Sequence, residues 1–61
     1  MGYEANVAAQ YRAHAEELRA IAEADKYETT REMLILVAEN YESMAENMDQ
    51  LDARHGRYKP A

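Results

Sequence analysis

A heptad repeat of apolar residues with alanine at one fixed position constrains this fold most. In the C-terminal half, apolar residues recur at alternating spacings of three and four, at Leu34, Val37, Tyr41, Met44, Met48 and Leu51. The N-terminal half repeats the frame at Val7, Tyr11, His14, Leu18 and Ile21. Position e of both halves is alanine, at Ala8, Ala15, Ala22, Ala38 and Ala45. Small residues let two helix axes approach near the lower end of the usual range of about 8–10 Å. The sequence therefore predicts an all-α fold of two antiparallel helices packed along alanine-lined seams.

A hairpin explains the middle of the chain better than one continuous helix. The frame has an a position at Asp25 and the next a series begins at Leu34, so a continuous helix would rotate its apolar seam away. Thr29 and Glu32 have the spacing of a capping box, which predicts a helix start with Thr29 as the N-cap.

These signals give one domain, residues 1–61, with a first helix over about 4–24 and a loop at 25–28. A second helix follows over about 30–54, with Gly56 as a C-terminal cap residue and a basic tail at 55–61.

The chain is short for a self-sufficient core. It has 61 residues and 7.0 kDa, and chains below about 70–80 residues rarely gain more than about 3–5 kcal/mol from one core. It contains no cysteine, which excludes disulfides, thiolate metal sites and a thiol nucleophile. Its longest apolar run, residues 33–38, is far below the roughly 20 residues of a membrane span. The N-terminus lacks the basic and apolar regions of a signal peptide, so we expect a cytoplasmic protein.

The start of the second helix predicts a partner chain. Residues 33–38 are apolar on every face, and Ile35 and Leu36 would stay in water in a single hairpin. Pairing of two hairpins into a four-helix bundle would cover them. The alternatives are that they are isolated exposed residues, or that the loop around Tyr27 covers them. We predict a homodimer, with another protein as a further possible partner and an interface made of Met33, Leu34, Ile35, Leu36, Val37, Tyr41, Met44 and Met48.

His14 is the main candidate for chemistry, because it occupies a d position where an apolar residue is expected. It could serve as a metal ligand, a phosphorylation site or a pH switch. Di-metal helical bundles use Glu-x-x-His, whereas this chain has only the reversed order, His14-x-x-Glu17. We favour a histidine at the core edge, in a cluster with Tyr11 and Tyr41 that fixes the helix register. No nucleophile–base set and no glycine-rich phosphate loop occurs, so we predict no enzyme activity, no cofactor and no metal.

The net charge of −5 is unevenly distributed. An acidic ribbon runs along the second helix and consists of Glu39, Glu42, Glu46 and Asp49. This ribbon is either a solvated face or a docking surface for a basic partner. On the first helix Arg12 and Arg19 alternate with Glu16 and Glu23. The alternative function is a nucleic-acid-binding regulator that uses the first helix and the basic tail, although the three cations Arg54, Arg57 and Lys59 are few for this task.

One sequence pattern resembles a known class of proteins. Tyr11-Arg12-x-x-Ala15-x-x-Leu18-Arg19-x-x-Ala22, followed by Arg31-x-x-Leu34-x-x-x-Ala38-x-x-Tyr41-x-x-x-Ala45, resembles short uncharacterised bacterial helical-hairpin proteins. In size and layout the chain is also similar to Rop-type dimeric four-helix bundles, which bind RNA. That resemblance implies a dimeric bundle. RNA binding of that kind needs a basic and polar face on the first helix, and Glu16 and Glu23 interrupt such a face here.

Overall fold

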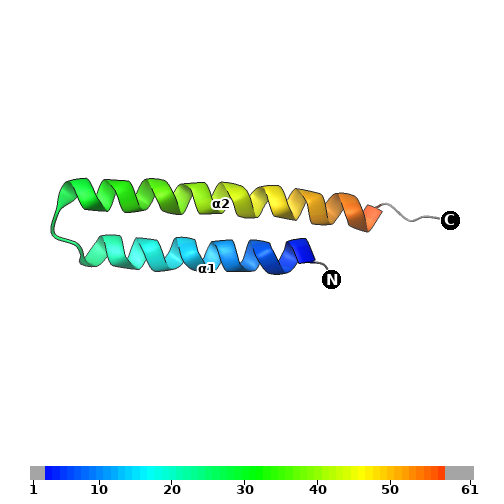
Figure 1. Ribbon diagram of the computed structural model, residues 1–61, viewed down its shortest axis with the longest axis horizontal. Coiled ribbons are helices and arrows are strands. Elements are labelled where there is room, and N and C mark those ends of the chain that lie inside the picture. Colours follow the sequence, from blue (N-terminus) through cyan, green and yellow to red (C-terminus); the bar gives the residue numbers. More distant parts are fainter. Residues whose placement is uncertain (1–2, 58–61) are drawn as a thin grey trace.

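The computed structural model describes residues 3–57, with side chains described as far as Arg54. Helix α1, Tyr3–Ala24, and helix α2, Glu28–Arg57, lie side by side and antiparallel (Figure 1). The molecule is elongated, with principal extents of 56 × 14 × 9 Å. The prediction of an all-α helical hairpin is confirmed.

The loop, residues 25–27, is closed by local hydrogen bonds. The Asp25 N–H donates to the Ala22 carbonyl (3.2 Å) at the end of α1, and the Asp25 carboxylate accepts from the Tyr27 N–H (2.7 Å). The Arg31 N–H donates to the Tyr27 carbonyl (3.0 Å), so the helical bonding of α2 starts at Tyr27. The prediction of Thr29 as the N-cap is wrong, and α2 begins at Glu28 rather than at about 30. The helix starts earlier because the Asp25 carboxylate already accepts a hydrogen bond from the Tyr27 N–H, two residues before Thr29.

The C-terminal end of α2 also differs from the prediction. The helix continues through Gly56 to Arg57 instead of ending near 54. Glycine costs only about 1 kcal/mol relative to alanine inside a helix, which is not enough to end it. Residues 58–61 of the predicted basic tail, including Pro60, lie outside the described residues.

Alanine forms the whole buried core of the described part of the chain. The buried residues are Ala8, Ala15, Ala22, Ala38 and Ala45, each at most 3% exposed. These are the five alanines of heptad position e, so the predicted alanine seam is confirmed. No large described side chain is fully buried. A hairpin built this way brings its helices together without enclosing a conventional core of large side chains.

Candidate interaction surface

The seam is centred between heptad positions a and e, rather than between a and d as the apolar repeat suggests. The e alanines are buried, and the a residues Leu18, Leu34 and Tyr41 are half-buried. At 3.6 residues per turn, the b and d rows of each helix then lie on opposite sides of this seam. The hairpin therefore has two long flanks, and they differ in chemistry.

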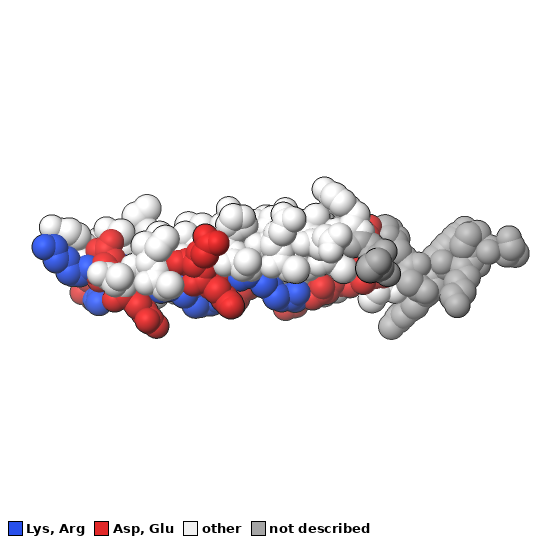
Figure 2. All heavy atoms as spheres, turned by 90° about the horizontal axis from the view of Figure 1, so that it is seen from below, with Lys and Arg blue, Asp and Glu red and all other residues white. Residues whose placement is uncertain are grey.

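The first flank, defined by the b rows and called the charged flank, carries ion pairs between the helices. Arg19 of α1 forms a two-pronged ion pair with Glu42 of α2, at 2.6 and 2.7 Å. Arg12 of α1 binds Asp49 of α2 one heptad further along. Figure 2 shows the Lys, Arg, Asp and Glu side chains gathered mainly along one edge of the hairpin. These pairs connect the two helices in antiparallel register.

The ion pairs shift the protonation of their members. The hydrogen bond from Arg19 lowers the pKa of Glu42, and the charge of Arg12 adds to this effect. The hydrogen bonds to Glu42 and Asp49 raise the pKa values of Arg19 and Arg12 respectively. Half of the predicted acidic ribbon, Glu42 and Asp49, is therefore paired with arginines of α1 while remaining about half exposed.

The second flank, defined by the d rows and called the open flank, leaves large apolar side chains uncovered. Ile21 is 53% exposed, and Val37 and Met44 are about two-fifths exposed. Along the opposite edge from the charges, Figure 2 shows mostly uncharged residues. The d rows of this flank consist of Val7, His14 and Ile21 on α1 and Val37, Met44 and Leu51 on α2. An exposed strip that is apolar apart from one histidine is typical of an interaction surface on a small protein.

An aromatic cluster lies halfway along the open flank. The His14 ring stacks on the Tyr41 ring, with centroids 5.3 Å apart and planes at 27°. Tyr11 contacts the same Tyr41 ring, with centroids 5.8 Å apart. The predicted association of Tyr11, His14 and Tyr41 is confirmed. His14 itself is exposed rather than buried at the core edge.

The predicted interface residues do not all share one face. Val37 and Met44 belong to the open flank, and Leu34, Tyr41 and Met48 line its inner edge, half-buried. Met33 and Leu36, at positions g and c, are 62% and 60% exposed on the outer side of α2. Ile35, at position b, lies on the charged flank. A helix distributes six consecutive residues around its whole circumference, so the apolar run at residues 33–38 supplies both flanks and the outer side of α2.

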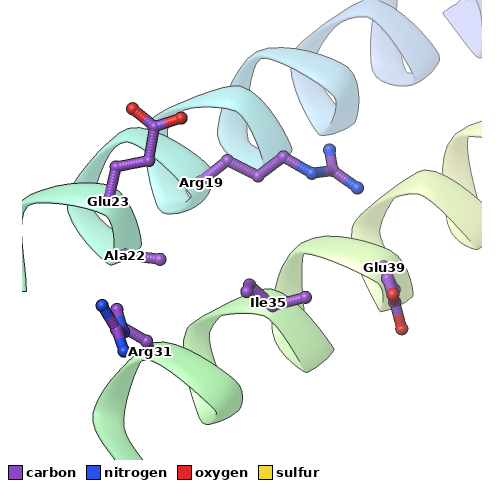
Figure 3. Close-up of a pocket in the computed structure, with 6 residues that line it drawn as sticks. All are labelled: Arg19, Ala22, Glu23, Arg31, Ile35 and Glu39. Carbon is purple, nitrogen blue, oxygen red and sulfur yellow. The ribbon is translucent and has the colours of Figure 1, made fainter. Parts of the chain in front are cut away.

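Ile35 lines a shallow hollow near the loop, of about 410 Å³. Ala22 and Ile35 point into the space between the helices, and Arg31 lies on the loop side of them (Figure 3). The hollow is completed by the charged residues Arg19, Glu23 and Glu39. Two cations and two anions surround its small apolar floor. Because these charges balance, the hollow favours neither an anionic nor a cationic ligand.

Among the described side chains, no three His, Asp or Glu residues come together as a metal site. Within the described residues, neither helix is long and apolar enough to cross a membrane.

Comparisons with protein-family models, with curated proteins and with solved structures gave no match to this chain.

Proposed function

We propose that this chain is a non-enzymatic helical interaction module that works as a homodimer, in which a second copy covers the open flank. The observation that carries the proposal is the mismatch between core and surface. Among the side chains that the structure describes, only five alanines are buried, whereas the larger apolar side chains on the open flank remain in contact with water.

The energetics favour a second layer. Burying apolar surface contributes about 25 cal/mol per Å², and alanine offers little such surface. A chain of 61 residues without disulfides therefore has little to offset its conformational entropy. A second hairpin on the open flank would bury Ile21, Val37, Met44 and Leu51 from both copies, which supplies the missing core.

The size of the flank suits a dimer interface. The 22 residues of α1 extend over about 33 Å, and two adjacent helices are about 20 Å wide. Such a face offers about 660 Å² per copy, or about 1,300 Å² in total, within the range of stable specific interfaces.

A second copy fits this face better than a charged partner does. The d rows of both helices carry no Asp, Glu, Lys or Arg, so their recognition depends on apolar packing rather than on charge. The charged flank would stay in water and limit further stacking of hairpins. An isologous contact of this kind closes with two copies.

The nucleic-acid alternative gains no support from the charged flank. Arg12 and Arg19, the cations that it would use on the first helix, are engaged by Asp49 and Glu42. To bind phosphates they would have to give up these intramolecular partners.

Two neighbouring residues of α2 provide a matched test. Val37 and Ile35 are both β-branched, and their exposed fractions are 42% and 41%, but they lie on opposite flanks. We expect Val37→Glu to weaken dimerisation by at least about a thousandfold, because each copy would bury an unpaired carboxylate. Ile35→Glu places the same carboxylate on the charged flank, so it should leave the dimer intact.

The measurement is the solution mass of each variant by light scattering across a range of protein concentrations, with helicity followed by circular dichroism. Val37→Ser serves as a milder version in case Val37→Glu fails to fold. A Val37→Glu dimer as tight as the unmodified protein would refute the proposed interface, and so would equal loss of dimer in the Val37 and Ile35 variants.

A further inference from the structure

His14 occupies the centre of the open flank. In the d row of α1 it lies between Val7 and Ile21, each one heptad away, and it is near the middle of the helix Tyr3–Ala24. Its ring is held against α2 by stacking on Tyr41. The imidazole is therefore a positioned group within an apolar surface, and it is exposed in the single chain.

The central position has a consequence for any symmetric dimer. The two-fold axis of a face-to-face dimer lies in the plane of the common face and runs either along the hairpins or across them. A residue at mid-length stays near mid-length under either operation, whereas residues at the two ends exchange places only in the second. Covering the open flank with a second copy therefore brings both His14 side chains into one central layer.

The groups around His14 offer little compensation for a positive charge in that layer. On α1 its titratable neighbours are Tyr11, one turn before it, and Glu17, one turn after it at the exposed edge of the flank. On α2 the group packed against it is Tyr41, and the nearest g positions are the uncharged Asn40 and Asn47. A second copy brings the same set of groups.

We propose that His14 makes association pH-dependent, so that the dimer is tight when the imidazole is neutral and dissociates when it is protonated. This inference rests on the homodimer proposed above. In the separated chain the imidazolium is hydrated and lies over the electron-rich face of Tyr41, so its charge is tolerated. In the dimer the same charge would be removed from water within an apolar layer, which is unfavourable.

The sign and size of the effect follow from linkage. A histidine side chain ordinarily gains its proton near pH 6.5, and glutamate and tyrosine do not ordinarily titrate between pH 5.5 and 7.5. Two histidines must lose protons for each dimer formed. The dissociation constant should therefore rise by about 100-fold between pH 7.5 and pH 5.5.

The test compares dissociation constants at these two pH values by sedimentation equilibrium. The unmodified protein should show the 100-fold rise, and His14→Gln should form a dimer of similar strength at both pH values. The second histidine of the chain provides the matched control, because His55→Gln should keep the full pH dependence. Glu17→Gln should also keep it, because Glu17 is not required to pair with the imidazole.

The outcomes separate this inference from the proposed function. A dimer whose dissociation constant does not change with pH, one that tightens in acid, or a pH dependence that persists in His14→Gln would each overturn the role of His14 and leave the dimer standing. A monomer at pH 7.5 and high concentration would overturn both proposals. If His14→Gln does not dimerise, His14→Leu replaces it, and the expectation is a tight dimer at both pH values.

Discussion

The two flanks of the hairpin are built on the same two helices, but only the charged flank satisfies its side chains within one chain. On the charged flank, Arg19 meets Glu42 and Arg12 meets Asp49 across the seam, so each cation finds its partner within one chain. On the open flank, the apolar side chains of Ile21 and Met44 remain exposed. Charged pairs tolerate water around them, whereas apolar side chains gain free energy only when they are removed from it. A single pair of helices therefore satisfies the side chains of the charged flank but leaves those of the open flank in water.

Both flanks depend on the alanine seam, and enlarging the seam should have the largest effect. Ala15 is fully buried between the helices. Ala15→Leu would force the axes apart and separate the partners on both flanks, at a cost of about 1–3 kcal/mol in the free energy of unfolding. Urea unfolding followed by circular dichroism measures this loss.

A second alanine of α1 provides the control for that experiment. Ala13 is exposed, and leucine is nearly as favourable as alanine in a helix. Ala13→Leu should therefore leave the unfolding free energy within about 0.5 kcal/mol of the unmodified protein. Equal destabilisation by the two substitutions would contradict a seam closed by alanine.

Added salt should affect the two flanks differently, and the expected change in free energy is smaller. At 1 M ionic strength the screening length falls to about 3 Å, so the coupling between exposed charges is reduced. The coupling between Arg19 and Glu42, measured by a double-mutant cycle with Arg19→Gln and Glu42→Gln, should decrease between 0.05 and 1 M NaCl. The dimer dissociation constant should not rise over the same range, because the open flank has no charge in its d rows. A dimer that dissociates in salt would place the interface on the charged flank instead.

The smallest expected effect is the acid dependence of the Arg19–Glu42 pair. Because the folded-state pKa of Glu42 is below its ordinary value, the pair stabilises the fold above that ordinary value and loses its contribution as the pH falls through the folded pKa. Glu42→Gln should therefore be slightly less stable than the unmodified chain at pH 7 and equally stable once Glu42 is protonated. Thermal unfolding at pH 7 and over a series of decreasing pH values provides the comparison, and a difference that does not decrease in acid would show that charge pairing is not its cause.

The sequence predicted the fold and the seam because both depend on local periodicity. The five alanines at position e, such as Ala15 and Ala38, indicated close packing, and the structure buries these residues. The frame shift around Asp25 indicated a turn without glycine or proline, and the loop lies there. Helix ends were less predictable, because the Asp25 turn competes with the capping signal of Thr29 and takes precedence.

The arrangement of the flanks could not be predicted from the repeat alone. An apolar 3–4 spacing indicates which residues lie on one stripe of a helix, but it does not indicate which edge of that stripe faces the second helix. The small alanines draw the axes together on the e side, and this turns Val37 and Met44 outward. It also brings Arg12 and Arg19 across the seam from Asp49 and Glu42, a pairing visible in the sequence only once the antiparallel register is known.

The measurement that tests the central claim most directly is the mass of the unmodified protein in solution at pH 7.5. If a second copy covers the open flank, light scattering should give about 14 kDa, twice the chain mass of 7.0 kDa, and dilution should lower mass and helicity together. A helical species that stays at 7.0 kDa at every concentration would contradict the account, because the open flank would then be stable in water without a partner.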